Sequence, residues 1–149
     1  MKVIVAKDAG YCFGVRDAVN LAYDTAKKFN DVYMLGDIVH NESVVNDLNK
    51  VGAKVVDKIE DVPKGKKILF RAHGTKPEIW EQANSEGKDV IDATCPLVHE
   101  IHHEVRKLDK EGRRIIIIGD HGHDEVMAIA AQVDKPIIIA SADEARSLS

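Results

Sequence analysis

The sequence has few cysteines, few aromatic residues and no long apolar run. Its two cysteines, Cys12 and Cys95, are too few for a disulfide framework in 149 residues, and they form no CxxC pair. Three phenylalanines, three tyrosines and one tryptophan leave little to build a platform on which nucleic-acid bases stack. No segment approaches the roughly 18 apolar residues of a membrane span, and the apolar start is too short for a signal peptide. We therefore expect a cytoplasmic protein in reducing surroundings, with no membrane partner.

The charge balance is mildly acidic. The chain has 21 Lys and Arg against 25 Asp and Glu, a formal net charge of -4. This balance argues against nucleic acid as the main partner, because binding its phosphates needs a basic face. Hydrophobic residues at 44% and charged residues at 31% are typical of an ordinary globular protein. The length predicts one domain, or one domain and part of a second.

Short β-branched runs alternate with segments of helical period along the whole chain. We expect strands at 2–6, 32–35, 54–56, 67–70, 90–91, 114–118 and 136–140. We expect helices at 15–29, 43–51, 76–86, 97–111 and 126–132. Apolar strands that alternate with helices predict an α/β fold, with mainly parallel sheets covered by helices on both faces.

Sequences typical of capping boxes begin at Thr75 and Ser141. The chain ends at Ser149, about two turns into the helix that Ser141 would open, and so short a helix is marginal unless it packs. We therefore expect these residues to be the front part of a longer protein. On the helix expected at 97–111, one face collects four apolar residues: Leu97, Ile101, Val105 and Leu108.

Cysteine or histidine occurs in five loops that follow predicted strands. These loops span residues 9–15, 36–41, 71–75, 92–96 and 119–125. In parallel α/β sheets, ligands bind beyond the carboxyl ends of the strands, beside helix N-termini. Cys95 lies between a predicted strand end and a helix start, where negative charge on a thiolate is stabilised. Five such loops in one chain indicate a single site that combines thiols with imidazoles.

Taken one at a time, these residues have ordinary structural interpretations. A lone cysteine is more often a small buried hydrophobe, and a lone histidine more often a capping or core residue. For three histidines of the helix at 97–111, we favour a solvated face: His99, His102 and His103. The loop at 119–125 differs, because His121 and His123 there precede two carboxylates, a combination suited to anion binding and proton transfer.

The residue types leave several chemistries open. Thiolates suit iron–sulfur clusters or zinc, whereas imidazoles and helix N-termini accommodate an anion such as phosphate or diphosphate. Two cysteines fall short of the three or four thiolates that usually hold a cluster. A zinc site is formally possible from Cys12, Cys95, His40 and His73. A non-catalytic zinc-binding module and a metal-free phosphate-binding α/β domain are therefore the alternatives.

Ordered motifs in these loops resemble the N-terminal half of the 4-hydroxy-3-methylbut-2-enyl diphosphate reductase family. These iron–sulfur enzymes perform the last step of the non-mevalonate isoprenoid pathway. The motifs are Gly10-Tyr11-Cys12-Phe13-Gly14-Val15, Val39-His40-Asn41, Ala72-His73-Gly74, Asp92-Ala93-Thr94-Cys95-Pro96-Leu97-Val98 and Gly122-His123-Asp124-Glu125. Family members are about twice as long and resemble a trefoil of α/β lobes around one cluster. The resemblance implies an N-terminal strand and cluster loop at 1–12, a first lobe at 13–96 and an incomplete second lobe at 97–149.

The resemblance also implies roles for single residues. Two of the family's three ligands to a 4Fe–4S cluster match Cys12 and Cys95. Its diphosphate-binding histidines match His40, His73 and His123, and its proton-relaying acid matches Glu125. The implied reaction removes the substrate's hydroxyl group reductively and gives isopentenyl and dimethylallyl diphosphate, with ferredoxin or flavodoxin as the electron donor. The third cysteine would lie beyond Ser149.

Overall fold

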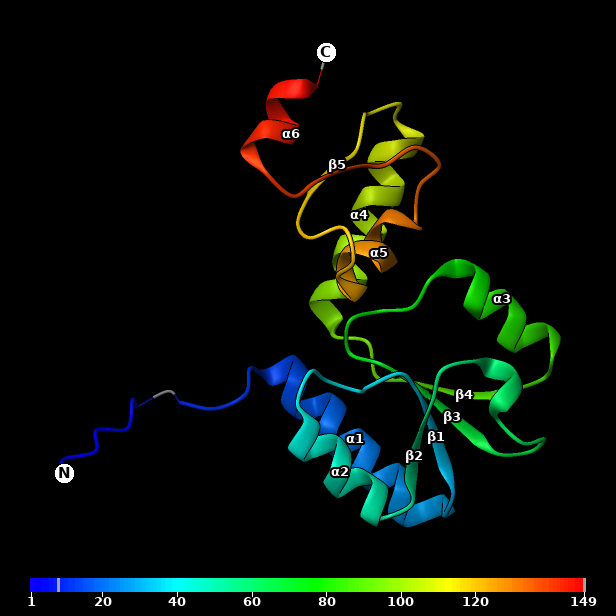
Figure 1. The fold of residues 1–149 in the computed structure, drawn as a ribbon. Coiled ribbons are helices and arrows are strands. Elements are labelled where there is room, and N and C mark those ends of the chain that lie inside the picture. The colour runs from blue at the N-terminus through cyan, green and yellow to red at the C-terminus, as the bar shows by residue number, and fades with distance from the viewer. Residues whose placement is uncertain (8, 149) are drawn as a thin grey trace.

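A four-stranded parallel sheet organises the first lobe in the computed structural model, which describes residues 1–7 and 9–148. Its strands are β1 (Val32–Leu35), β2 (Ala53–Val56), β3 (Lys67–Phe70) and β4 (Asp89–Asp92), in the order β2-β1-β3-β4. The first lobe also holds α1 (Phe13–Phe29), α2 (Glu42–Lys50), α3 (Pro77–Ser85) and the one-turn η1 (Ile59–Asp61). Helices α1 and α2 lie on one side of the sheet and α3 on the other (Figure 1). The predicted parallel α/β arrangement is confirmed.

The core beneath α1 follows from side-chain alternation along the strands. In β1, Val32 and Met34 are fully buried because successive side chains of a strand point to opposite faces. They pack in one cluster with three small residues spaced four apart on α1: Ala18, Ala22 and Ala26. Small side chains at this spacing form one face of the helix. They let α1 approach the sheet closely, and its N-terminus then lies at the edge where the strands end.

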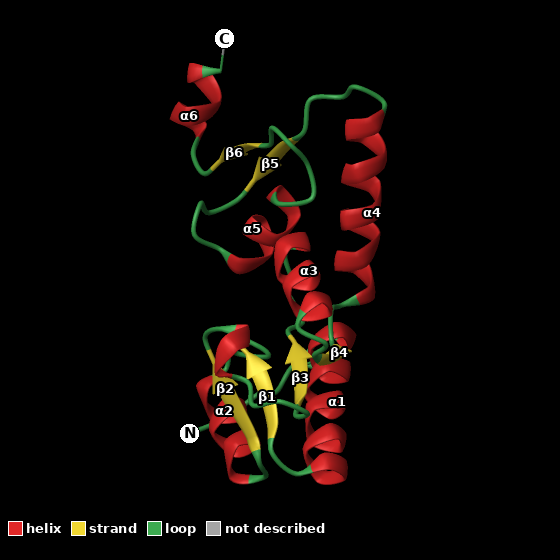
Figure 2. Cartoon of the chain, turned by 90° about the vertical axis from the view of Figure 1, so that its right-hand side faces the viewer, coloured by secondary structure: helices red, strands yellow, loops and turns green. Residues whose placement is uncertain are grey.

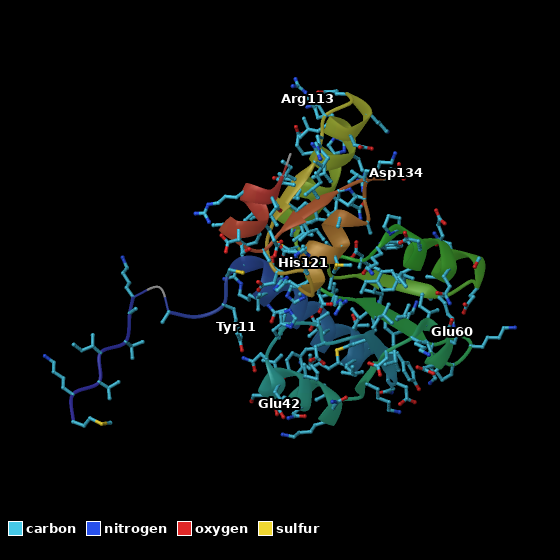
Figure 3. All side chains as sticks on the ribbon, turned by 45° about the horizontal axis from the view of Figure 1, so that its top comes forward. Tyr11, Glu42, Glu60, Arg113, His121 and Asp134 are labelled. Atoms are coloured by element: carbon cyan, nitrogen blue, oxygen red, sulfur yellow. The ribbon has the colours of Figure 1, made fainter. Side chains whose placement is uncertain are left out.

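The second lobe is smaller and less covered. It comprises α4 (Pro96–Lys110), β5 (Ile116–Ile118), α5 (Asp124–Ala130), β6 (Ile137–Ile139) and α6 (Ala142–Ser147), with β5 and β6 paired in parallel (Figure 2). Ile118 of β5 is 85% exposed. In Figure 3, Arg113 and Asp134 mark the outer end of this lobe, whereas His121 lies toward the first lobe. No helix in the described part of the chain has the length and apolarity needed to cross a membrane.

The predicted N-terminal strand at 2–6 is wrong. Residues 1–7 form no regular element, and Val3, Ile4 and Val5 are more than 70% exposed. An extended segment becomes a strand only when a neighbour accepts and donates its backbone hydrogen bonds. Within the described residues no strand lies beside this segment, which extends away from the body (Figure 1).

Two details of the helices also differ from expectation. The capping box at Thr75 is not formed, since α3 begins one residue later with Lys76 as N-cap, whose side chain cannot accept a hydrogen bond. At Ser141 half of the box is formed: the Ser141 hydroxyl accepts from the Glu144 backbone N–H at 3.2 Å, but the Glu144 carboxylate accepts from the Ala140 N–H rather than from that of Ser141. The expected apolar face of α4 is not its buried face, as Leu97 and Ile101 are 51% and 41% exposed. Apolar spacing gave the period of this helix but not the direction in which its neighbours lie.

Phe70 holds the opposite face of the first sheet together, and its removal should be costly. Its ring is fully buried and meets Trp80 edge to face, with centroids 4.7 Å apart. We expect Phe70→Ala to lower the free energy of unfolding by about 3–5 kcal/mol, the usual range for a large core cavity. Urea unfolding followed by Trp80 fluorescence measures this loss. The control Phe29→Ala removes a ring that is 39% exposed and should cost much less; equal costs would contradict the assigned core.

Candidate functional site

The strand order creates a crevice between the carboxyl ends of β1 and β3. From β1 the chain runs through α2 to β2 on one side, whereas from β3 it runs through α3 to β4 on the other. The loops that leave β1 and β3 therefore diverge. A topological switch point of this kind is where open α/β sheets bind their ligands. His40 lies in the first of these loops and His73 in the second.

Three histidines from both lobes meet at this switch point. The rings of His40 and His73 stack, with centroids 4.2 Å apart and planes inclined by 26°. His123, from the loop before α5 in the second lobe, meets them edge-on at 5.6 and 6.1 Å. The expected convergence is confirmed for these three residues, and the expected convergence of Cys12 and Cys95 with them stays a prediction. We call these three residues the histidine cluster.

His123 is oriented by the helix that it begins. It is the N-cap of α5, and its Nδ1 accepts a hydrogen bond from the Glu125 backbone N–H at 3.3 Å. A neutral ring that accepts at Nδ1 carries its proton on Nε2. That ring therefore keeps an N–H donor free for another partner. Glu125 itself is half-buried in the first turn of α5, one turn from the cluster.

His73 is the member of the cluster with the most perturbed acidity. Burial lowers the pKa of His73 to about 4, and the neighbouring His40 and Arg71 act in the same direction, while Asp124 opposes them. Its Nδ1 is buried and has no hydrogen-bond partner among the described residues. The ring is therefore neutral at physiological pH. A neutral imidazole binds an anion by donating a hydrogen bond rather than by its charge.

The two cysteines lie at the starts of two long helices. Cys12 is the N-cap of α1 and Cys95 that of α4, and neither side chain caps its helix. A Cβ added to Gly14 would lie 2.5 Å from the Cys95 Sγ, so the thiol rests directly on the first turn of α1. The Cys95 backbone N–H donates to the Ala72 carbonyl at 3.0 Å, next to His73 in the chain. Both cysteines are free thiols.

A short tether connects the segment before Cys12 to the loop that carries His40. The Asn41 side chain caps α2 by accepting from the Val44 N–H at 3.1 Å, and its amide donates to the Tyr11 hydroxyl at 3.0 Å. Figure 3 shows Tyr11 where the N-terminal segment joins the body. Cys12 therefore begins α1 beside the crevice, although no strand precedes it.

The described donors do not form the four-ligand zinc site considered from the sequence. Among residues 1–7 and 9–148, no group of three or more His, Cys, Asp or Glu side chains gathers around a common metal position. The site of two cysteines and two histidines is therefore not formed; His40 and His73 stack on each other and meet His123 edge-on instead. Cys12 and Cys95 are free thiols at the starts of α1 and α4, and thiolates are soft ligands of the kind that iron–sulfur clusters take.

Two of the other histidines each contact a carboxylate. His121 pairs with Glu144 at 2.8 Å, and His99 with Asp92 at 3.0 Å. For His99 and the exposed His103, the expected solvated face is correct.

For His102 the expectation is wrong. Its side chain is only 5% exposed, and it packs on Gly74, where an added Cβ would lie 2.7 Å from its Cε1. Gly74 has φ +87°, which favours glycine, so His102 supports the loop that carries His73. Its Nε2 has no partner among the described residues. Nothing in the i, i+3, i+4 spacing distinguishes this histidine from its neighbours.

Comparison with known proteins agrees with the motifs. Residues 3–149 match the family described as LytB protein. The chain belongs to the LytB family. Curated LytB relatives named 4-hydroxy-3-methylbut-2-enyl diphosphate reductase include one from Rhodopirellula baltica, 42% identical over 146 residues, which cover 97% of this chain and 46% of the relative. Another, from Caldanaerobacter subterraneus subsp. tengcongensis, is 37% identical over 153 residues and covers 99% of this chain and 53% of its own.

Two solved structures of LytB relatives share the fold. The E-1-hydroxy-2-methyl-but-2-enyl-4-diphosphate reductase from Plasmodium falciparum matches 96% of this chain with a TM-score of 0.92 and 34% identity. A (E)-4-hydroxy-3-methyl-but-2-enyl diphosphate reductase, described as the terminal enzyme of the non-mevalonate pathway, matches 95% with a TM-score of 0.82 and 35% identity. This chain covers 46% and 52% of those two chains. It spans about half the length of the relatives that it matches.

The buried histidines should make the fold sensitive to mild acid. Burial also lowers the pKa of His102, so the folded state resists the protons that the unfolded chain accepts below its ordinary value of 6.5. The free energy of unfolding should therefore fall as the pH drops from about 7 to 5, since the unfolded state binds more protons.

Urea unfolding at several pH values measures that slope. His73→Gln and His102→Gln should each flatten it. The exposed His103→Gln is the matched control on α4 and should leave the slope unchanged. A slope that is the same in all variants would show that neither buried ring is neutral for the reason given.

Proposed function

We propose that this chain is the N-terminal part of a 4-hydroxy-3-methylbut-2-enyl diphosphate reductase, an iron–sulfur oxidoreductase of isoprenoid biosynthesis. The observation that supports this most is the histidine cluster, His40, His73 and His123, gathered from both lobes at the switch point of the sheet. In the proposed enzyme, this cluster binds the diphosphate group of the substrate. The relatives named above carry the same substrate in their names.

Hydrogen bonding, more than positive charge, holds the diphosphate in this proposal. His73 is neutral at physiological pH, and the nearby cation Arg71 is already paired with Asp124 at 2.6 Å. His123 has a free Nε2–H when its ring is neutral, because its Nδ1 accepts from Glu125. A bound anion stabilises the protonated form of an imidazole, so anion binding should oppose the effect of burial and raise the pKa of His73. In the short chain, affinity should be weak and sensitive to salt.

Glu125 supplies the protons. It lies in the first turn of α5, two residues from His123. Reductive removal of a hydroxyl group needs electrons and protons and releases the oxygen as water. A half-buried carboxyl group at this position can donate such a proton as a general acid.

Cys12 and Cys95 hold two corners of a 4Fe–4S cluster, which supplies electrons to the substrate when it is bound. The chain provides only these two thiols, fewer than the three that the reductase family uses. We therefore assign the third ligand to the rest of the longer protein. Ferredoxin or flavodoxin is the proposed donor, and a reducing cytoplasm is the proposed location, because the ligating cysteines must stay reduced.

A metal-free phosphate-binding domain is the alternative function. It is favoured by one observation: the histidine cluster is complete in this chain without any contribution from the cysteines. In a version extended to the length of the relatives, anaerobic purification with iron and sulfide assays separates the two functions. A brown, iron- and sulfide-containing protein supports the reductase, and a colourless one supports the alternative.

Replacing a cluster histidine should weaken diphosphate binding. We expect His40→Asn, His73→Asn and His123→Asn each to lower the affinity for inorganic diphosphate by about tenfold, the scale of one hydrogen bond to a charged group. Isothermal titration of the 149-residue chain measures this, with circular dichroism to confirm folding. The exposed His103→Asn and the double change of Cys12 and Cys95 to Ser are controls that should bind as the unaltered chain does. Binding that ignores all three cluster variants would overturn the assignment.

Replacing Glu125 should impair turnover without affecting assembly of the iron–sulfur cluster. In the extended version, Glu125→Gln should lower turnover by about 10²-fold or more, the usual effect of losing a general acid, at unchanged iron content. The 149-residue chain should show no turnover, because two thiols leave a cluster labile. Normal turnover in the Gln variant would make Glu125 an ordinary helix-start carboxylate.

A further inference from the structure

One ion pair joins α5 to the first lobe beside the histidine cluster. The Arg71 guanidinium donates from Nη1 to the Asp124 carboxylate at 2.6 Å, and both side chains are about two-thirds buried. Arg71 lies two residues before His73, and Asp124 directly follows His123. Among the described residues, this is the one side-chain hydrogen bond or ion pair that links α5 to the first lobe. The two partners therefore sit at the point where His123 enters the cluster.

The boundary between α5 and the first lobe, which we call the seam, is loosely packed around this ion pair. No helix or strand of the first lobe packs broadly against α5 within the described residues. A cavity of about 480 Å³ lies there instead, lined by Arg71, Gly74 and Ile79 on one side and by Ala128 of α5 on the other. Apolar packing against the first lobe is thus a weak constraint on where α5 lies relative to that lobe. A directional contact at this seam has correspondingly more influence on its position.

Arg71 is itself held before it reaches Asp124. Its guanidinium lies over Gly36, where an added Cβ would be only 3.0 Å from Nη1, and Gly36 has φ +72°. The loop after β1 therefore leaves room for the guanidinium just where it turns toward His40. One side chain thus touches the loop that carries His40, belongs to the loop that carries His73 and binds the residue after His123.

We propose that the Arg71–Asp124 ion pair is a positioning pair, which holds His123 against His40 and His73 and so completes the anion site across the two lobes. This inference rests on the proposed function, since the anion is the diphosphate that the cluster binds. In this proposal Arg71 acts through His123 rather than on the anion, since its Nη1 donates to Asp124, the residue that follows His123. The contact needs opposite charges on its two partners, so loss of either Arg71 or Asp124 should release His123.

Binding of inorganic diphosphate distinguishes this role from direct anion binding by Arg71. If the pair positions His123, then Arg71→Gln and Asp124→Asn should each weaken binding by about 3- to 10-fold, and the double variant should be no weaker than the singles. The charge-reversed variant, Arg71→Asp with Asp124→Arg, should recover part of the loss. If Arg71 binds the anion directly, Asp124→Asn would instead leave the affinity equal or raise it, which would overturn the proposal.

Two features of the chain make the test robust. Arg146 and Asp143 form a similar arginine–aspartate pair at the start of α6, far more exposed and within one helix, so Arg146→Gln and Asp143→Asn are matched controls that should not change binding. The ring protons of His123, observed by NMR without any anion, report whether its ring still lies against the other two. They should shift in Arg71→Gln and Asp124→Asn but not in the controls.

The two measurements separate failure of this inference from failure of the proposed function. If the unaltered chain binds no diphosphate but the His123 resonances shift as expected, the proposed function fails and the positioning role stands. If His123 resonances and diphosphate affinity are the same in both variants as in the unaltered chain, the positioning role is overturned. Should Arg71→Gln fail to fold, Asp124→Asn carries the same test from the other side of the seam.

Discussion

The four residues that follow β3 each contact a different part of the molecule. Arg71 binds Asp124 of the second lobe, and the backbone of Ala72 accepts from the Cys95 N–H and donates to the Ile38 carbonyl. His73 stacks on His40, and Gly74 leaves room for His102 of α4. A turn this short can serve four neighbours only if its backbone and side chains all keep one conformation. The geometry of the histidines and the placement of Cys95 both depend on it.

The acidity of the cluster follows from that packing. Burial of His73 disfavours its charged form, and the neighbouring His40 ring and Arg71 cation add to the effect. Three imidazoles can then lie together without strong mutual repulsion, because at least this ring is neutral at physiological pH. Burial therefore makes His73 an uncharged member of the histidine cluster. An arriving anion supplies the negative charge that makes protonation favourable, so binding and proton uptake are linked.

Because the histidine cluster is divided between two lobes, its geometry depends on how the lobes pack. His40 and His73 are fixed by one sheet, but His123 depends on how the second lobe sits on the first. That seam contains a cavity, a buried histidine on Gly74 and a partly buried ion pair rather than a continuous apolar core. Directional contacts fix orientation better than apolar packing, but each tolerates little displacement. The three histidines therefore keep their relative positions only while the contacts at the seam are intact, and a small shift of the second lobe would separate His123 from the other two.

The sequence by itself determined the class of fold and the membership of the histidine cluster. Apolar strands at 32–35 and 67–70 form as predicted, and parallel strands bring the loops that carry His40 and His73 to one edge of the sheet; that these two strands are neighbours came from the structure. The motifs around Cys12 and Cys95 indicated the protein family. These features are local: a period, a turn residue or a short motif reveals them.

Only the tertiary structure decided which residues support the site. Arg71 and Asp124 lie 53 positions apart, and nothing near either residue in the sequence marks the other as its partner. The face of α4 that carries His102 is buried while Leu97 is exposed, because the loop at Gly74 lies on that side. The apolar segment at 2–6 forms no strand for the same reason, since a strand exists only where another strand lies beside it. Periodicity along a chain states what an element can bury, and the position of its neighbours decides what it does bury.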